Sequence, residues 1–377
     1  MEQDRWLQRI SSKHVSRRGV LGAAGAAALL AACGGVDTKD KSGTKPQSRV
    51  PSELESELSV YNWADYVHPK TYKQFRKEFD VDLTEANYAS NEEALAKLQA
   101  GARGYDVIAP TGYMVEIMAG EGLLFELDKS KIPNFSGVES TYTDLPFDPG
   151  NKYSVPKDFG TTGYGYRPSL VKEEMTSWED FYRLASKYSG RYTVLDSPPE
   201  VIGSALKMLG YSYNTTDVKE IDEATKEIIK LKPHIRKITS SMRELLGTGE
   251  AYVSLTWNGE VYYSTLIKGG EDSTYVLPSE GTEIWLDNWS ILAEAPHPAL
   301  AHAFLNWHLQ PRVQAQDVSY HFYGSPVEGE EEFLDPAILN DPTVYPPPDV
   351  AAKMEIYEAD VEAQRLRNEA WTKFKAS

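Results

Sequence analysis

The stretch LSVYNWADYVHPKTYKQFRKEF, residues 58–79, decides the fold of this chain. Its first part, Leu58 to Trp63, is rich in aromatic and aliphatic residues and predicts a β-strand. The remainder predicts a helix, because Tyr72, Phe75 and Phe79 lie on one face at helical spacing. A strand that leads directly into a helix of this length is the repeating unit of α/β proteins.

The same alternation continues along the chain. Further strands are predicted at 81–84, 105–109, 192–195, 251–257 and 284–292, and further helices at 178–185, 200–209, 222–231 and 299–309. Ser90 and Glu93 have the spacing of a capping box at the start of another helix, for which Gly101 is a natural stop. One long final helix is predicted from about Val350 to Phe374. We therefore expect an α/β fold with a mainly parallel sheet.

The N-terminal end predicts an export signal over residues 1–32. Arg17 and Arg18 precede an apolar run, Val20 to Ala32, which is shorter than the roughly 18 apolar residues of a membrane span. The paired arginines are twin-arginine-like, although Val20 stands where such signals usually carry Phe. The segment LAACG, residues 30–34, resembles a bacterial lipobox, which implies that Cys33, the single cysteine of the chain, is lipidated.

Residues 33–57 are polar and predict a lipid-anchored flexible linker. Removing residues 1–32 leaves 345 residues, more than the roughly 250–300 that one hydrophobic core holds, so two lobes are expected. The formal net charge is −17, and a signal of net +3 would leave a mature chain of about −20. Such a charge argues against nucleic acid as a partner and weakly favours cationic ligands.

Tryptophan and aspartate stand two residues apart in Trp63-Ala64-Asp65 and in Trp285-Leu286-Asp287. On extended backbone, the ring and the carboxylate of each pair point to the same side. A carboxylate beside a ring face suits an alkylammonium group, since the acid accepts its hydrogen bonds and the ring attracts the cation. The spacing alone leaves open the alternative that each Trp is buried beside an exposed Asp.

Short motifs in a common order resemble the bacterial spermidine/putrescine-binding proteins. YNWADYV at 61–67 is similar to the YNWxEYV opening of that family. The motifs that follow are YDVI at 105–108, PTGY at 110–113, PFDP at 146–149, YSVP at 153–156, TSW at 176–178, LGY at 209–211, WNG at 257–259 and WLD at 285–287. The similarity extends from about residue 58 to the C-terminus. Each motif is weak by itself, and the resemblance rests on their common order along the chain.

This resemblance implies a type II periplasmic-binding-protein fold, with two discontinuous lobes joined by a hinge and the ligand between them. The implied aromatic box consists of Trp63, Tyr66, Tyr113, Trp257, Trp285 and Tyr323. The implied amine-pairing carboxylates are Asp65, Glu200 and Asp287, and the implied hydroxyl contacts are Thr111 and one of Ser240 or Ser241. The lobes are expected at 58–156 with 287–331, and at 157–286 with 332–377.

Two positions depart from the family pattern. Ser197 stands where spermidine binders carry an Asp, and Glu358 stands where they carry a Gln, so Glu358 is a further candidate for ligand binding. One acid is thus lost and another gained. The resemblance predicts a polyamine of the putrescine or spermidine type and leaves open which one is preferred.

Two other classes of function remain open. A ferric-ion or other small-solute receptor of the same fold is suggested by the phenol pair Tyr262-Tyr263, although these residues also fit a packed helix, and His297, His302 and His308 lack the spacing of metal ligands. A carbohydrate-active hydrolase would also place acids and aromatic rings in a cleft, but the sequence has no nucleophile elbow, phosphate loop or zinc helix.

The resemblance further implies partners and a location. The chain is expected to be a receptor rather than an enzyme, to deliver its ligand to the permease subunits of an ABC importer with a separate ATPase, and to need no cofactor or metal. It is expected to be monomeric and attached through Cys33 to the outer face of the cytoplasmic membrane.

Overall fold

A computed structural model of the chain describes residues 50–358 and 360–377, so the predicted signal and Cys33 lie outside the described residues. Its strands form a mixed sheet of nine strands in the order β2-β1-β3-β9-β4-β7-β5-β6, with β8 beside β4. The strands are β1 Glu57–Trp63, β2 Asp82–Tyr88, β3 Val107–Ile108, β4 Ser154–Tyr166, β5 Tyr192–Val194, β6 Ile235–Ile238, β7 Val253–Trp257, β8 Thr274–Val276 and β9 Ile284–Ile291.

Helices cover this sheet and separate its strands along the chain. They are α2 Pro69–Phe79, α3 Asn91–Gln99, α4 Gly112–Gly120, α5 Trp178–Leu184, α6 Pro198–Met208, α7 Val218–Leu231, α8 Arg243–Gly247, α9 Asn258–Thr265, α10 Pro298–His308, α11 Pro311–His321, α12 Pro336–Leu339, α13 Pro348–Ala351 and α14 Val361–Ala376. The predicted capping box is present at α3, where Ser90 Oγ accepts from Glu93 N and the Glu93 carboxylate accepts from Ala89 N. None of the described helices combines the length and the apolar character needed to cross a membrane.

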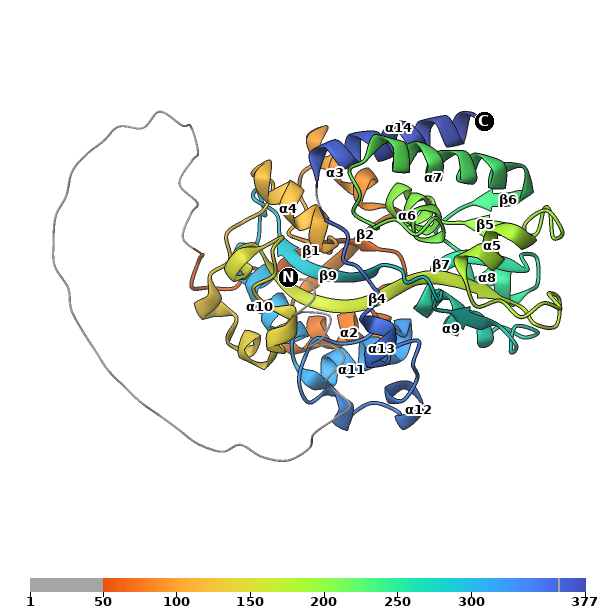
Figure 1. Ribbon diagram of the computed structural model, residues 1–377. Coiled ribbons are helices and arrows are strands. Elements are labelled where there is room, and N and C mark those ends of the chain that lie inside the picture. The colour runs from red at the N-terminus through yellow and green to blue at the C-terminus, as the bar shows by residue number, and fades with distance from the viewer. Residues whose placement is uncertain (1–49, 359) are drawn as a thin grey trace.

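The strands β4 and β9 run side by side through the middle of the molecule (Figure 1). β4 pairs with β9 over its first half and with β7 over its second half, and all of these pairings are antiparallel. Parallel pairing occurs between β1 and its neighbours β2 and β3, and between β5 and its neighbours β6 and β7. The expectation of a mainly parallel sheet is therefore corrected to a mixed sheet, because the two long central strands run against their neighbours.

Two large hydrophobic cores flank the middle of β4. Phe159 belongs to the first core and Tyr164 to the second. Later in the chain, Val276 belongs to the second core and Ile284 to the first. We propose that the lobes join within 159–164 and 276–284, a few residues from the boundaries expected from the sequence. The C-terminal segment also divides: Leu334 and Ile338 pack in the first core, whereas Leu366 and Phe374 pack in the second.

The single helix predicted from Val350 to Phe374 is two helices, α13 and α14. Between them, the Glu355 carboxylate accepts hydrogen bonds from Lys207 Nζ at 2.7 Å and from Tyr213 N at 3.0 Å. The Glu355 backbone also bridges to Glu283, next to β9. These tertiary contacts require an extended backbone at this point and override the local preference for a helix.

The linker predicted for 33–57 ends earlier than expected. Val50 is 8% exposed and packs in the first core. The Glu55 carboxylate accepts from Leu300 N at 2.8 Å and from Ala299 N at 3.3 Å, and so caps the start of α10. Residues 50–57 are therefore part of the folded domain, because an apolar side chain and a helix cap hold them there.

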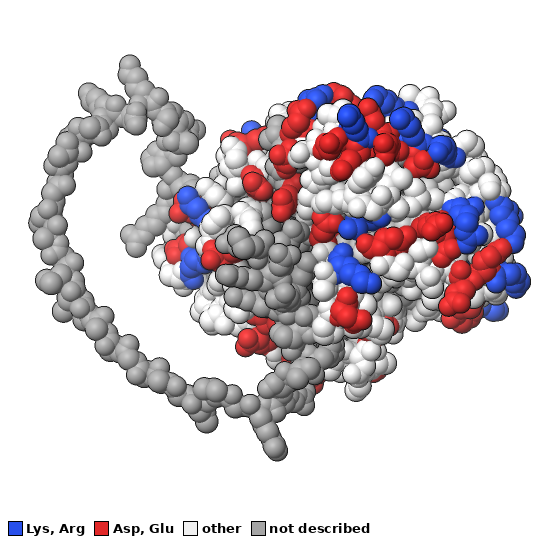
Figure 2. Space-filling model, in the orientation of Figure 1, with Lys and Arg blue, Asp and Glu red and all other residues white. Residues whose placement is uncertain are grey.

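The surface carries acidic and basic side chains in close mixture. Figure 2 shows Asp, Glu, Lys and Arg side by side along the upper edge of the molecule, where Figure 1 places α14. On this helix Arg365 pairs with both Glu362 and Glu369. Pairs of this kind on a helix surface contribute only about 0.3–0.5 kcal/mol each, so they mainly serve solubility.

Gly259 on α9 allows the end of α11 to pack closely beside the predicted site. A Cβ at this position would lie 2.1 Å from the His321 carbonyl oxygen and 2.6 Å from the Tyr323 ring. We expect Gly259→Ala to lower the free energy of unfolding by about 1–3 kcal/mol, measured by urea denaturation, since overpacking forces backbone shifts. Gly120→Ala, where nothing lies within 4 Å of a Cβ, is the matched control. Equal stability of the two variants would contradict this account of the packing.

Candidate functional site

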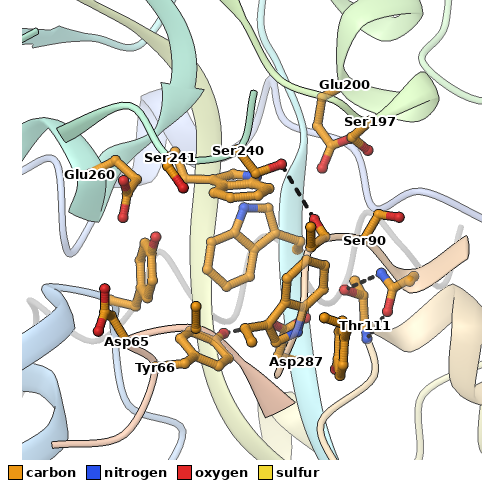
Figure 3. A pocket seen from close by; sticks show the side chains of 18 of the residues that line it. Asp65, Tyr66, Ser90, Thr111, Ser197, Glu200, Ser240, Ser241, Glu260 and Asp287 are labelled. Atoms are coloured by element: carbon orange, nitrogen blue, oxygen red, sulfur yellow. Dashed lines mark hydrogen bonds between the residues drawn. The ribbon is translucent and has the colours of Figure 1, made fainter. Parts of the chain in front are cut away.

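A cleft of about 570 Å³ lies between segments that belong to the two cores, within the range of small-molecule sites. Ten of the eleven predicted ligand-binding residues line it: Trp63, Asp65, Tyr66, Thr111, Tyr113, Glu200, Trp257, Trp285, Asp287 and Tyr323. Ser240 and Ser241 both line it as well. In Figure 3, Asp65 and Glu260 lie on one side of this cleft, and Glu200 and Ser197 lie on the opposite side. The sequence thus predicted residues that the fold brings together from across the chain.

The remaining candidate, Glu358, does not line the cleft. Its side chain is exposed, and its backbone N–H donates to Asn214 Oδ1 at 3.0 Å. Asp65 lines the cleft, but its geometry differs from the prediction. β1 ends at Trp63, and Asp65 follows in a left-handed turn with φ 55° and a side chain that is 64% exposed. The extended backbone assumed for both pairs is therefore present at Trp285 and Asp287 on β9 and absent at Asp65, although all four residues line the cleft.

Aromatic rings from distant parts of the sequence form the walls of the cleft. The rings of Trp63 and Trp257 have centroids 6.0 Å apart and meet edge to face at 75°. Trp285 meets Tyr323 edge to face at 4.8 Å, and Tyr323 meets Tyr66 at 5.8 Å. Such edge-to-face contacts fix the rings and add about 0.5–1.5 kcal/mol each beyond their buried area. The walls therefore present fixed π-faces, which attract cations and cover methylene groups.

Thr111 and Tyr113 stand at the start of α4 and are held by one amide. Asn91 Nδ2 donates to Thr111 Oγ1 at 2.9 Å and to the Tyr113 hydroxyl oxygen at 3.2 Å. The Tyr113 hydroxyl in turn donates to Glu92 Oε1 at 2.9 Å. Asn91 therefore fixes two hydroxyl groups of the cleft wall, and this residue was not recognised in the sequence because a lone amide carries no pattern.

Asp287 shares a phenol with a second aspartate beneath the cleft. The Tyr66 hydroxyl oxygen lies 2.5 Å from Asp158 Oδ1 and 2.5 Å from Asp287 Oδ2. Burial opposes the ionisation of Asp158, but Lys157 and His321 outweigh it and hold the pKa of Asp158 at about 2. Burial, followed by the charge of Asp158, raises the pKa of Asp287 to about 7. The single proton of the Tyr66 hydroxyl can serve only one of the two contacts, so a proton on Asp287 completes the network.

Two further acids, Glu200 and Glu283, line the cleft. Burial raises the pKa of Glu200 to about 7, although the Ser197 hydroxyl donates a hydrogen bond to it. Glu283 is 3% exposed, and burial, followed by the charge of Glu200, raises its pKa well above the usual value. Sequence reasoning missed Glu283. Glu283 stands two residues before Trp285, which itself stands two residues before Asp287. Residues two apart on a strand point to the same face, so extending this spacing would have found Glu283.

Two buried polar atoms of the cleft lack partners among the described residues. Asp287 Oδ1 and Trp285 Nε1 are buried and make no hydrogen bond there. A buried polar group without a partner costs about 1–3 kcal/mol. A ligand that donates to a carboxylate oxygen would remove part of this cost. Acids with raised pKa values beneath aromatic faces are thus suited to hold a protonated amine.

The residues that suggested a metal have structural roles. Tyr262 and Tyr263 lie on α9, which confirms the packed-helix interpretation, and Tyr262 stacks on Phe322 with ring centroids 3.8 Å apart. His302 Nε2 accepts from Asp128 N at 3.0 Å, and His308 pairs with Asp317 at 2.8 Å. Within residues 50–358 and 360–377, no group of three or more His, Cys, Asp or Glu side chains has the geometry of a metal site.

Known proteins of one family resemble this chain over most of its length. The sequence pattern of the family described as bacterial extracellular solute-binding protein matches residues 70–345. The spermidine/putrescine-binding periplasmic protein of Escherichia coli K12 is 35% identical over 323 residues, which cover 85% of this chain and 91% of that protein.

Solved structures agree with this match. The spermidine/putrescine ABC transporter substrate-binding protein PotD of Streptococcus pneumoniae superposes with a TM-score of 0.72 at 30% identity, over 85% of this chain and 99% of that one. The PotD lipoprotein Tp0655 of Treponema pallidum superposes with a TM-score of 0.75 at 26% identity, over 84% of this chain and 99% of that one. The fold is thus the two-lobed α/β fold of periplasmic binding proteins, as predicted. The chain belongs to the bacterial extracellular solute-binding protein family.

The raised pKa of Asp287 predicts how stability depends on pH. A carboxyl whose pKa is higher in the folded state stabilises the protein at low pH, and this contribution is lost as pH rises towards about 7. We expect Asp287→Asn, which removes the ionisable group, to unfold at a higher temperature than the unchanged protein at pH 8, without ligand, and to show a much smaller difference at pH 5. The full shift would correspond to at most roughly 4 kcal/mol.

The measurement is thermal unfolding of both proteins at the two pH values. Asp222→Asn is the control, since this side chain is 54% exposed and the substitution should give the same small difference at both pH values. A difference for Asp287→Asn that does not change with pH would show that the carboxyl is already ionised in the empty cleft.

Proposed function

We propose that this protein is the extracytoplasmic receptor of an ABC importer and that it binds a polyamine of the putrescine or spermidine type. The observation that carries the proposal is the group of carboxyls Asp287, Glu200 and Glu283, which face one cleft beneath fixed aromatic rings. A buried charge is tolerated only with a partner of opposite charge, and an alkyl chain with ammonium ends supplies both the charge and the apolar surface.

Binding exchanges protons for ammonium groups. Burial keeps protons on Asp287 and Glu200 in the empty cleft up to about pH 7. An ammonium group favours the ionised form of each acid, so the bound amine lowers these pKa values and releases protons. The Trp and Tyr faces cover the methylenes between the ammonium ends. Affinity therefore rises as the pH rises through about 7, where the amine is still protonated.

The position of the cleft between two lobes suggests that the lobes close around the ligand. Trp63 packs beside the first core and Trp257 beside the second, so a ligand that contacts both rings stabilises the closed arrangement. A ligand shifts such an equilibrium only by its difference in affinity for the two states. We propose that the closed form is the one that docks on the permease subunits, with a separate subunit hydrolysing ATP.

The first test is a ligand panel on the purified protein. We expect thermal unfolding to shift upward with putrescine, cadaverine or spermidine, because a ligand at about 100 times its dissociation constant adds roughly 2.7 kcal/mol. Asp287→Asn should weaken amine binding at least tenfold in titration calorimetry, since it removes one ammonium partner. A shift with ferric citrate, a sugar or an amino acid, and none with amines, would leave the fold intact and refute the polyamine assignment. Turnover of a chromogenic glycoside would instead favour a hydrolase.

We further propose that residues 1–32 direct export and that Cys33 carries the lipid anchor on the outer face of the cytoplasmic membrane. The lipobox-like segment at 30–34 supports this, as does the similarity to a protein described as a lipoprotein. Cys33→Ala should move the protein from the membrane pellet to the soluble fraction of fractionated cells, because no lipid is then attached. Ser42→Ala, in the same segment, is the control and should stay in the membrane pellet. An unchanged distribution of Cys33→Ala would refute the anchor.

A further inference from the structure

The cleft contains one basic side chain among many acids. Among the described residues that line it, Arg243 at the start of α8 is the only Lys or Arg. The acids that line it are Asp65, Glu93, Glu200, Glu244, Glu260, Glu283 and Asp287. A fixed cation inside a site for a polycation changes which of these acids a ligand can use.

Arg243 is engaged by its neighbours on one side of the cleft. Its Nε lies 3.1 Å from Glu260 Oε1 and 3.3 Å from Glu260 Oε2, and its Nη2 also donates to this carboxylate. Its Nη1 is 3.6 Å from Asp65 Oδ2, and its Cζ is 4.3 Å from the centre of the Tyr263 ring. Glu260 is 6% exposed, and the Arg243 side chain is 18% exposed. The guanidinium is therefore held by a bidentate carboxylate and an aromatic face, which restricts its movement.

This side of the cleft is distinct from the side of the free acids. Figure 3 shows Asp65 and Glu260 on one side and Glu200 on the other. Glu200 and Asp287 both raise the pKa of Glu283, so these three acids lie close enough to interact. None of the three is paired with a Lys or Arg among the ion pairs of the described residues. The cleft therefore has a part with buried acids that have no basic partner, and a part in which Arg243 pairs with the buried Glu260 and lies near the exposed Asp65.

We propose that Arg243 is a specificity-determining residue that occupies the place of a third ammonium group, so that the cleft selects a short diamine over a triamine. This inference rests on the polyamine function proposed above. A diamine places both ammonium groups among Glu200, Glu283 and Asp287. A triamine is longer by an aminopropyl unit, and its additional ammonium extends towards Arg243. Two cations brought close together repel each other, and the buried acid at that place, Glu260, is already paired with Arg243.

The test compares 1,4-diaminobutane and spermidine by titration calorimetry of the purified protein and its Arg243 variants. The unchanged protein should bind the diamine at least tenfold more tightly. Arg243→Gln keeps a hydrogen-bond donor for Glu260 but removes the charge, so it should strengthen spermidine binding at least tenfold and change diamine binding less than threefold. Arg243→Lys keeps the charge and should keep the preference for the diamine, which a merely structural role of the guanidinium would not explain.

Two further variants complete the design. In Arg243→Gln with Glu260→Gln, spermidine affinity should fall between the unchanged protein and the single variant, because the carboxylate that would receive the third ammonium is gone. This double variant also leaves no unpaired buried charge, so it serves if the single variant does not fold. Arg236→Gln is the control, since it breaks an exposed pair with Glu250 and should leave the ratio of affinities unchanged.

The outcomes distinguish failure of the role proposed for Arg243 from failure of the proposed polyamine function. Polyamine binding with equal affinity for both amines, or with a ratio that neither Arg243→Gln nor the double variant alters, would overturn the role of Arg243 and leave the polyamine function standing. Absence of binding of either amine to the unchanged protein would overturn both.

Discussion

The burial of carboxyl groups between two lobes is the constraint on which the rest of this structure depends. Asp287 and Glu283 are at most 5% exposed, and Glu200 faces the same cleft. An isolated carboxylate in such a place costs so much free energy that it takes up a proton, a protein cation or a ligand cation. The raised pKa values of these acids indicate that they take up a proton, and a proton is released again reversibly. A cleft that holds protons when empty is ready to exchange them for another cation.

The strands that carry the site lie next to the proposed crossovers between the lobes, one within β4 and one just before β9. β9 presents Trp285 and Asp287, while β4 presents Lys157 and Asp158 just before the proposed crossover. Because these antiparallel strands pair directly, with Asp158 opposite Asp287, the electrostatics of the site are fixed at the point where the lobes connect. A change of charge at Asp287 therefore acts close to the proposed crossover in β4. If the lobes close around a ligand as proposed, binding and closure would share a physical basis in this pair of strands.

The sequence predicted the fold and most of the cleft because both rest on regular patterns. Strand–helix alternation gave the α/β class, and ordered motifs gave ten residues that line one cavity. The failures arose where tertiary contacts override local preference. Asp65 turns into a left-handed conformation, and Glu355 binds Lys207 and so interrupts a predicted helix. Arg243 was not predicted, since its importance comes from neighbours that are distant in sequence.

Two basic side chains near the cleft explain which acids remain free for a ligand. Lys157, buried beneath the cleft, keeps Asp158 ionised, and the charge of Asp158 in turn helps to keep the proton on Asp287. Arg243 pairs with Glu260 in the same way on the cleft wall. An acid with a basic partner is a fixed salt bridge, which a ligand would have to break at high cost. An acid without one holds only a proton, which a ligand displaces easily near neutral pH. For the proposed polyamine ligand, the arrangement of the protein's own cations would thus determine where an ammonium group can lie.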